Sequence, residues 1–352
     1  MRGVNFGGWF SQIDAVSEKD PQRFPGVRAH LETFLGPADF ARVRAWGFDH
    51  VRLPVDYFNA FTGTELVPDQ AVLGLLDRAV DGLLAAGLRV ILDLHKCPGH
   101  DFLEGIERDQ GFFSDPALRA GARRVWSHLA ERFGHRSGVL LEILNEPVAP
   151  DAAAWNAVKD EMAAHIRRLA PRATIVVAAN RWNQVGEFAH LTPVPDDNIL
   201  YSFHYYLPLL FTHQFAPWMP AAHFQVRRPY PGEYAVPAGT ESRLPLDSGR
   251  WDRVRMERSL EPVLRFRERY QVPVGCHEFG VYAGGADRPS QLAWMRDFLS
   301  LLRDHDLGWS YWNYRNLDFG LISSGEARFA RSPQYDNPER TDRELVQLLA
   351  TH

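Results

Sequence analysis

The chain has 352 residues, of which 45% are hydrophobic and 24% charged, an ordinary composition for a soluble globular protein. Its net charge of −5 comes from acidic and basic residues mixed throughout, which excludes the electrostatic footprint expected for binding to nucleic acid or anionic lipid. No stretch approaches the roughly 18 consecutive apolar residues of a membrane span.

Short apolar runs recur along the chain and predict eight strands. Continuous apolar runs of this length are typical of strands buried on both faces of a parallel sheet. In chain order they cover residues 3–6, 50–53, 88–95, 139–145, 173–179, 198–204, 274–278 and 308–312.

Amphipathic helices are predicted between these strands. In residues 71–86 apolar side chains recur with helical spacing, and Gly87 is expected to end the helix. Asp39 and Asp115 are typical of helix starts. The other predicted helices are 117–133, 152–169, 255–270 and 291–303. Alternating strands and helices in this number predict an α/β fold, a (β/α)8 TIM barrel that occupies residues 1–352 as a single domain.

The longest irregular stretch, residues 207–250, joins the sixth predicted strand to its helix and contains seven prolines. A loop this long in a compact domain is usually a lid or a binding loop, so we expect an insertion on the barrel rim. Inert padding of the rim is the alternative.

The two cysteines and the N-terminal residues give information on the cellular compartment of the protein. Cys97 and Cys276 follow strands that would lie far apart around a barrel, so we expect free thiols and a reducing compartment. The first residues show no signal peptide, which favours a cytoplasmic location for the chain as written. Removal of a leader from a secreted precursor stays open.

Two glutamates, Glu146 and Glu278, each end an apolar strand at equivalent points of the predicted barrel. A carboxylate in that position is costly to desolvate unless it is used or paired. A pair of them indicates glycoside hydrolysis. Two unrelated salt bridges are the plain structural interpretation.

Other polar side chains gather at the same end of the predicted barrel. Active sites of such barrels lie where the strands end. The residues there are Arg52, His95, Asn145, Glu146, His204, Tyr206, Glu278 and Trp312. Each has a plain explanation alone, but together they would leave one end of the barrel with an excess of unpaired polar groups.

The chain resembles family 5 glycoside hydrolases, barrel enzymes with catalytic glutamates after strands four and seven. Seven stretches in order carry the resemblance: Gly3 to Trp9, Val51 to Pro54, Asp93 to His95, Leu144 to Pro147, His204 to Tyr206, Glu278 to Gly280 and Trp312 to Tyr314. Phe211 to Gln214, followed by Trp218, is similar to the bacterial endoglucanase branch of the family. That branch often has a second histidine after His95, where this chain has Lys96.

The resemblance implies a role for each residue of the site. Glu146 would be the general acid and base, and Glu278 the nucleophile. Arg52 and Tyr206 would hold Glu278 ionised, and Asn145 would hydrogen-bond the sugar 2-hydroxyl. The remaining implied contacts are His95 and His204 as positioning groups, Trp312 as the floor of the sugar site, and Asn5, Trp9, Trp182 and Asn183, for which packing is an equal alternative.

We therefore expect a retaining endo-acting β-1,4-glucanase that acts on β-glucans or cello-oligosaccharides. No cofactor, no metal, and no nucleic-acid or membrane partner are expected, and we expect a monomer. The alternatives are an exo-acting β-glucosidase or β-1,3-glucanase, a β-mannanase, an inactive carbohydrate-binding barrel, and a metal-dependent barrel hydrolase that uses the histidines. The last is disfavoured because no two histidines have the spacing of a metal pair.

Overall fold

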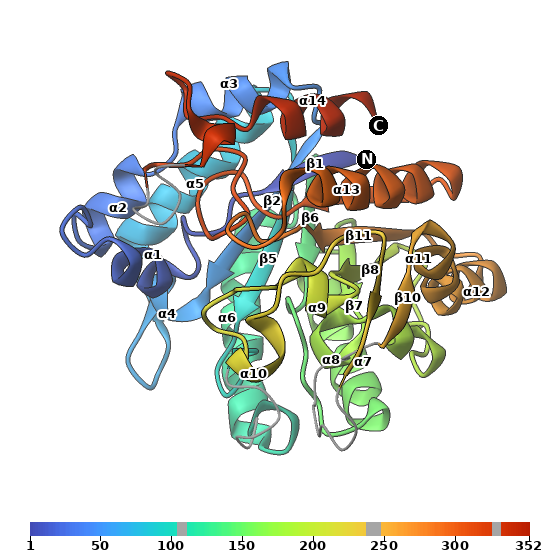
Figure 1. Ribbon diagram of the computed structural model, residues 1–352. Coiled ribbons are helices and arrows are strands. Elements are labelled where there is room, and N and C mark those ends of the chain that lie inside the picture. The colour runs from blue at the N-terminus through green and yellow to red at the C-terminus, as the bar shows by residue number, and fades with distance from the viewer. Residues whose placement is uncertain (104–110, 237–247, 326–331) are drawn as a thin grey trace.

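The computed structural model describes residues 1–103, 111–236, 248–325 and 332–352. Eight parallel strands close into a barrel (Figure 1). They are β1 (Arg2–Asn5), β2 (His50–Asp56), β5 (Arg89–Lys96), β6 (Val139–Glu142), β7 (Thr174–Ala178), β8 (Ile199–Tyr205), β11 (Val274–Phe279) and β12 (Gly308–Tyr311). Each pairs with the next, and β12 returns to β1. The predicted (β/α)8 barrel is confirmed.

All eight predicted strands are present, and most of their ends shift by one or two residues. The fourth was predicted to run to Asn145, but its ladder stops at Glu142. Beyond that point the backbone N–H groups of Ile143 and Asn145 still donate to Val176 and Leu94 on the two flanking strands. The segment that leads to Glu146 is thus fixed from both sides without being regular strand.

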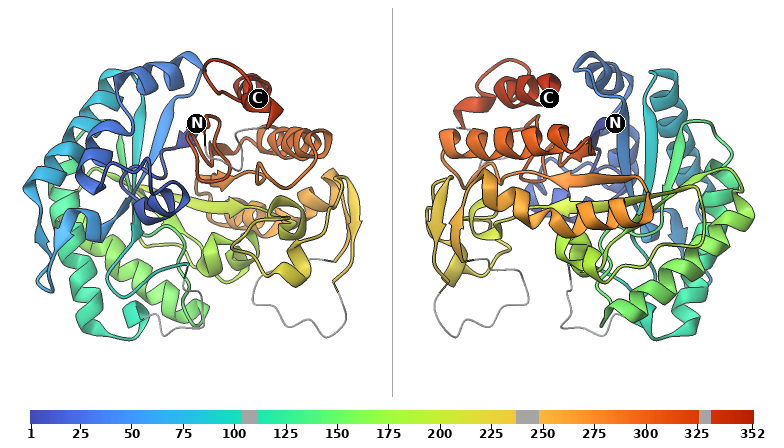
Figure 2. Two further views of the ribbon diagram at one scale, coloured as in Figure 1. Left: turned by 60° about the vertical axis from the view of Figure 1, so that its left-hand side comes forward. Right: turned by 90° about the vertical axis from the view of Figure 1, so that its right-hand side faces the viewer.

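Helices surround the barrel (Figure 2). They are α1 (Ile13–Lys19), α2 (Val27–Thr33), α3 (Pro37–Ala45), α4 (Tyr57–Ala60), α5 (Gln70–Ala85), α6 (Pro116–Phe133), α7 (Ala152–Leu169), α8 (Asn180–Asn183), α9 (Leu209–Thr212), α10 (Ala221–Phe224), α11 (Arg253–Ser259), α12 (Glu261–Tyr270), α13 (Arg288–Asp304) and α14 (Arg343–Thr351). Aspartates cap several of the long ones. The Asp115 side chain accepts from the backbone N–H of Ala117 at 2.7 Å, as expected for a helix start.

Two details of the helices differ from the sequence prediction. The helix expected over 255–270 is divided into α11 and α12 at Leu260, because Pro262 lacks an N–H and its ring clashes with the carbonyl four residues earlier. Asp39 is not the first residue of a helix. It lies in the first turn of α3, and its carboxylate accepts from the backbone N–H of Gly36 at 3.0 Å.

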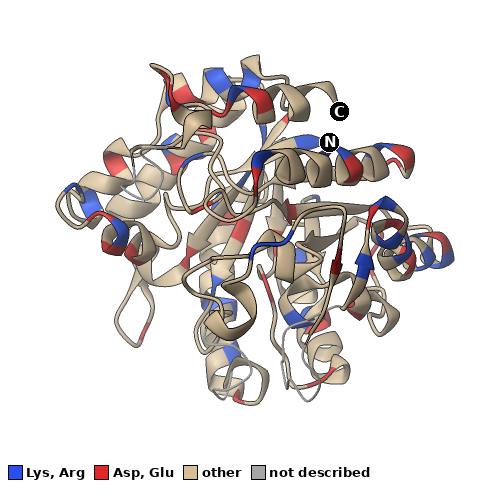
Figure 3. Cartoon of the chain, in the orientation of Figure 1, with Lys and Arg blue, Asp and Glu red and all other residues tan. Residues whose placement is uncertain are grey.

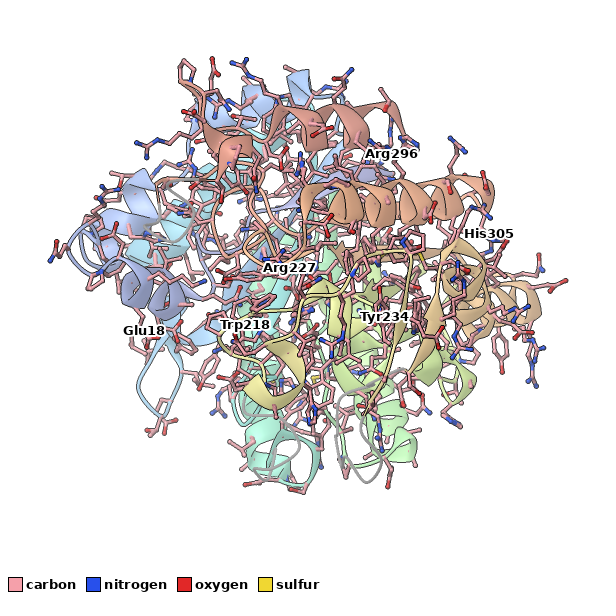
Figure 4. The ribbon with its side chains drawn as sticks, viewed as in Figure 1. Glu18, Trp218, Arg227, Tyr234, Arg296 and His305 are labelled. Atoms are coloured by element: carbon pink, nitrogen blue, oxygen red, sulfur yellow. The ribbon has the colours of Figure 1, made fainter. Side chains whose placement is uncertain are left out.

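The insertion between β8 and α11 is only partly irregular. It contains α9, α10 and an antiparallel pair of short strands, β9 (Gly232–Tyr234) and β10 (Gly249–Trp251). Its start is tied to helix α13 by the indole N–H of Trp294, which donates to the carbonyl of Leu207 at 3.0 Å. Figure 4 labels Trp218 and Tyr234 from this insertion. Residues 237–247 of the predicted loop lie outside the described residues.

Basic and acidic residues are interspersed along the outer helices (Figure 3). Cys97 and Cys276 are buried free thiols, as expected. Within the described ranges, no helix combines the length and the apolar character that crossing a bilayer requires.

Candidate active site

Glu146 and Glu278 face each other at the carboxyl end of the barrel. Glu146, Glu278 and His204 each have one carboxyl oxygen or ring nitrogen that lies within 4.8 Å of the corresponding atoms of the other two residues. One oxygen of Glu146 therefore lies within 4.8 Å of one oxygen of Glu278. The side chains are 12% and 7% exposed. Two nearly buried carboxyl groups this close cannot both be ionised at low cost, so the site favours one shared proton.

Glu278 is the better stabilised anion of the two. Its carboxylate accepts from Arg52 Nη1 at 2.7 Å and from the Tyr206 hydroxyl at 3.0 Å. Burial raises the pKa of Glu278, and the attraction to Arg52 and the two hydrogen bonds oppose this, which leaves the pKa at about 7.

Glu146 lacks such a cation. Its carboxyl group lies 2.8 Å from Nδ1 of His204, a residue whose burial lowers its pKa well below the usual value and keeps the ring neutral. Burial, followed by repulsion from Glu278, raises the pKa of Glu146 well above its usual value. The arrangement therefore places the proton on Glu146 and the negative charge on Glu278.

The same three side chains could in principle offer ligands to a metal ion. The Arg52 guanidinium argues against a cation there, because it already lies 2.7 Å from the Glu278 carboxylate and would repel a second positive charge. The chemistry of the donor set fits a carboxylate pair better than a metal centre.

Three nitrogen atoms around the pair are free to bind a ligand. Nε2 of His95, Nδ2 of Asn145 and Nε2 of His204 are buried and have no hydrogen-bond partner among the described residues. Since buried polar groups are nearly always satisfied, unpartnered ones beside two carboxylates point to a ligand with many hydroxyl groups. The other polar atom of Asn145, its Oδ1, accepts from Arg52 at 2.7 Å.

The indole of Trp312 forms one wall of the site. Its ring is parallel to that of His95, with centroids 5.8 Å apart and an interplanar angle of 1°. A Cβ on Gly7 would lie 2.5 Å from the Trp312 ring, so only glycine leaves room for the indole in this position. The two segments are further joined by the N–H of Gly7, which donates to Asn313 Oδ1 at 3.0 Å.

Gly7→Ala should displace the Trp312 ring, because the added methyl group overlaps it. We expect a loss of about 1–3 kcal/mol in the free energy of unfolding, which is typical of overpacking, and a raised KM on glycosides. Denaturant unfolding and steady-state kinetics measure the two effects. Gly186→Ala is the matched control, since a Cβ there meets nothing within 4 Å. Unchanged KM in Gly7→Ala would mean that Trp312 does not contact substrate.

The four remaining sequence candidates lie in different places. Trp182 is half-buried on the rim, where its indole N–H donates to the carbonyl of Phe102 at 3.0 Å. Asn5 lies at the bottom of the site, and its Oδ1 accepts from Arg52 Nη1 at 3.0 Å. Trp9 and Asn183 are explained by packing. The indole of Trp9 lies among core aromatic rings and donates to Leu31, and the amide of Asn183 is satisfied by Ala179 and Ser202.

Sequence reasoning missed a buried layer beneath the site. Asp93 and Glu142 are fully buried partners of Arg52, and His277 Nδ1 lies 3.5 Å from Glu142. The available signal was a carboxylate in the middle of an apolar strand, as in the run Leu140 to Leu144. Lys96, which departs from the family pattern, is 4% exposed and pairs with Asp101 at 2.8 Å.

The closed barrel and its carboxylate pair define a glycosidase of the (β/α)8 class. The family profile "Cellulase (glycosyl hydrolase family 5)" matches residues 17–318, and the chain belongs to this family.

The relatives are similarly named. Endoglucanase C of Acetivibrio thermocellus is 32% identical over 99% of this chain and 97% of its own length. Cellodextrinase A of Ruminococcus flavefaciens is 30% identical over 80% of this chain and 76% of its own length. Among solved structures, Thermotoga maritima Cel5A in complex with cellobiose has a TM-score of 0.74 and 20% identity, covering 99% of this chain and 96% of that one. At that identity the likeness concerns the fold.

Proposed function

We propose that the protein is a retaining endo-acting β-1,4-glucanase. The observation that carries this proposal is the short separation of two carboxyl groups with unequal affinity for a proton. Retaining glycosidases have their carboxyl groups about 5–5.5 Å apart, whereas inverting enzymes need about 6.5–9.5 Å to admit a water molecule between the acid and the sugar. In this protein, one oxygen of Glu146 lies within 4.8 Å of one oxygen of Glu278, which supports the shorter, retaining arrangement.

The reaction follows from the proton positions. The Glu278 carboxylate attacks the anomeric carbon while the glycosidic bond breaks, and Glu146 gives its proton to the departing oxygen. This leaves a glycosyl ester on Glu278, whose negative charge is gone. Because that charge no longer raises the pKa of Glu146, the Glu146 carboxylate is stable enough to act as a base in the next step. Water then attacks the anomeric carbon, its proton goes to Glu146, and the ester bond to Glu278 breaks.

The three unpartnered nitrogens fit this reaction. Asn145 Nδ2, which has no partner among the described residues, would donate to a sugar hydroxyl next to the anomeric carbon, a contact that strengthens as positive charge develops on the ring. His95 and His204 would bind the sugar or orient the glutamates. The indole of Trp312 offers a flat apolar face for the pyranose ring.

The choice of a β-1,4-glucan rests on the relatives. Endoglucanase C matches nearly the whole chain, which supports an internal cut in a glucan chain. An exo-acting enzyme of the family is the second candidate, because the insertion after β8 could close one end of the substrate site. Product analysis on a long mixed-linkage β-glucan separates them: a ladder of oligosaccharides supports endo action, and glucose alone overturns it.

The stereochemical course tests retention. Proton NMR of an early digest of a soluble cello-oligosaccharide should show the β-anomer of the new reducing end first, with the α-anomer appearing only by mutarotation. If the α-anomer appears first, the enzyme inverts and Glu278 is not a nucleophile. If the chain binds oligosaccharide without cleaving any β-glucan or β-mannan, it is a carbohydrate-binding barrel.

A further inference from the structure

Arg52 is shared by more acids than its charge can neutralise. The guanidinium is fully buried and lies within 3.0 Å of three carboxylates, from Asp93, Glu142 and Glu278. One positive charge among three buried negative ones would be strongly unfavourable, so at least one of the acids must hold a proton.

Geometry identifies Glu142 as the principal ionised partner. It is the only one of the three that accepts two hydrogen bonds from the guanidinium, from Nε at 2.7 Å and from Nη2 at 3.1 Å. Both Glu142 oxygens are thus used as acceptors, as bidentate Arg–carboxylate pairs require. Consistently, although burial alone would raise it, the attraction to Arg52 leaves the pKa of Glu142 below its usual value.

Asp93 is arranged differently. Only one of its oxygens is engaged: Oδ2 lies 3.0 Å from Arg52 Nη2 and 2.8 Å from Nδ1 of His95, while Oδ1 has no partner among the described residues. A carboxyl group with one empty oxygen is poorly stabilised as an anion. As a neutral acid it donates from Oδ2 to His95 Nδ1, which leaves the N–H of His95 on the unpartnered Nε2.

We propose that Glu142 is a positioning residue for hydrolysis: as an ionised partner it orients the Arg52 guanidinium and competes with Glu278 for its charge, while Asp93 stays neutral. The remaining donors of Arg52 are then directed at the site, with Nη1 toward Glu278 and Nη2 toward Asn145. Because Glu142 draws on the same cation, Glu278 is a more basic nucleophile than it would be with Arg52 to itself.

Titratable groups from several strands and the segments that follow them surround Glu278 and bear on the expected pH dependence. Three of them, Arg52, Asp93 and His95, belong to β2 and β5. Glu142 ends β6 and Glu146 follows it, while His204 lies on β8 and Tyr206 directly follows that strand. Cys276 and His277 precede Glu278 on β11 itself. Activity requires Glu278 ionised, so kcat/KM rises as the pH passes upward through its pKa.

Glu142→Gln tests the proposal. It removes a negative charge beside Arg52, so Glu278 ionises more easily, and we expect the acidic limb of the kcat/KM profile to move to lower pH by about one unit. Asp93→Asn should leave that limb in place, because it replaces one neutral group with another of the same shape. Glu142→Asp keeps the charge but shortens the reach, so it should lower kcat and keep the limb. Exposed Glu268→Gln is the control for a remote charge change.

The outcomes separate cleanly. A loss of kcat in Glu142→Gln with an unmoved limb would make Glu142 a merely structural residue. An equal shift in Asp93→Asn would mean that Asp93 is ionised, which also overturns the proposal. If Glu142→Gln does not fold, a moved acidic limb in Asp93→Asn or in Glu142→Asp still overturns the proposal. The inference rests on the proposed role of Glu278, whose own failure would appear separately, as turnover that survives in Glu278→Gln.

Discussion

Glu278→Gln is expected to abolish hydrolysis. The amide has nearly the same shape: its oxygen can still accept from Arg52, and its NH2 group can donate to the Tyr206 hydroxyl oxygen. It cannot attack the anomeric carbon or form the glycosyl ester. Removal of a covalent nucleophile costs on the order of 10⁴-fold or more in kcat. Release of the chromophore from an aryl β-cellobioside, followed over hours, measures the residual rate.

Folding of this variant provides the control. Because the folded-state pKa of Glu278 is raised to about 7, ionising this carboxyl costs the folded protein stability as the pH rises from the unfolded-state value through 7. The neutral glutamine avoids this cost, so the thermal midpoint of Glu278→Gln at pH 8 should equal or exceed that of the wild type. Inactivity together with a lowered midpoint would point to damaged structure. Glu268→Gln on the surface should match the wild type in both measurements.

The barrel could be predicted from the sequence because its strands are buried on both faces and its long helices carry apolar stripes. Local patterns of that kind depend on near neighbours in the chain. The pairing of β9 with β10 could not be predicted in the same way, since the two short strands are separated by more than a dozen residues and meet only in the folded insertion. Pro262 was a readable break in the predicted helix 255–270, and its effect was overlooked.

Some residues of the candidate site could likewise be predicted from the sequence, and others could not. Side chains at strand ends, such as Glu146 and Glu278, could be selected because the fold places all such ends together. Asp93 and Glu142 lie one layer deeper, and their partnership with Arg52 depends on the registers of three strands. For Trp9 the sequence leaves packing and substrate contact as equal alternatives, because an aromatic residue near a strand end belongs as readily to the core as to a ligand site. The structure places it among core residues.

Glu146→Ala should affect substrates according to their leaving groups. A sugar hydroxyl leaves poorly without a proton, so we expect kcat on unactivated β-glucan to fall by about 10²–10⁴-fold, the usual contribution of a general acid. A dinitrophenolate leaves without help, so formation of the glycosyl ester from a dinitrophenyl cellobioside should stay fast. The ester should then accumulate, because no base remains to activate water. A burst of released phenolate, equal to the enzyme concentration, measures this.

Added azide distinguishes an acid/base residue from one that only shapes the site. The anion needs no base and fits the space that the missing side chain leaves, so it should raise the steady-state rate of Glu146→Ala and give a β-glycosyl azide. The wild type should not respond, because its own carboxylate repels the anion. His204 adds a second check: its Nδ1 loses its partner in this variant, so His204→Asn combined with Glu146→Ala should cost less than the two separate losses added together. Wild-type activity of Glu146→Ala on β-glucan, or rescue that yields the α-azide, would contradict the assignment.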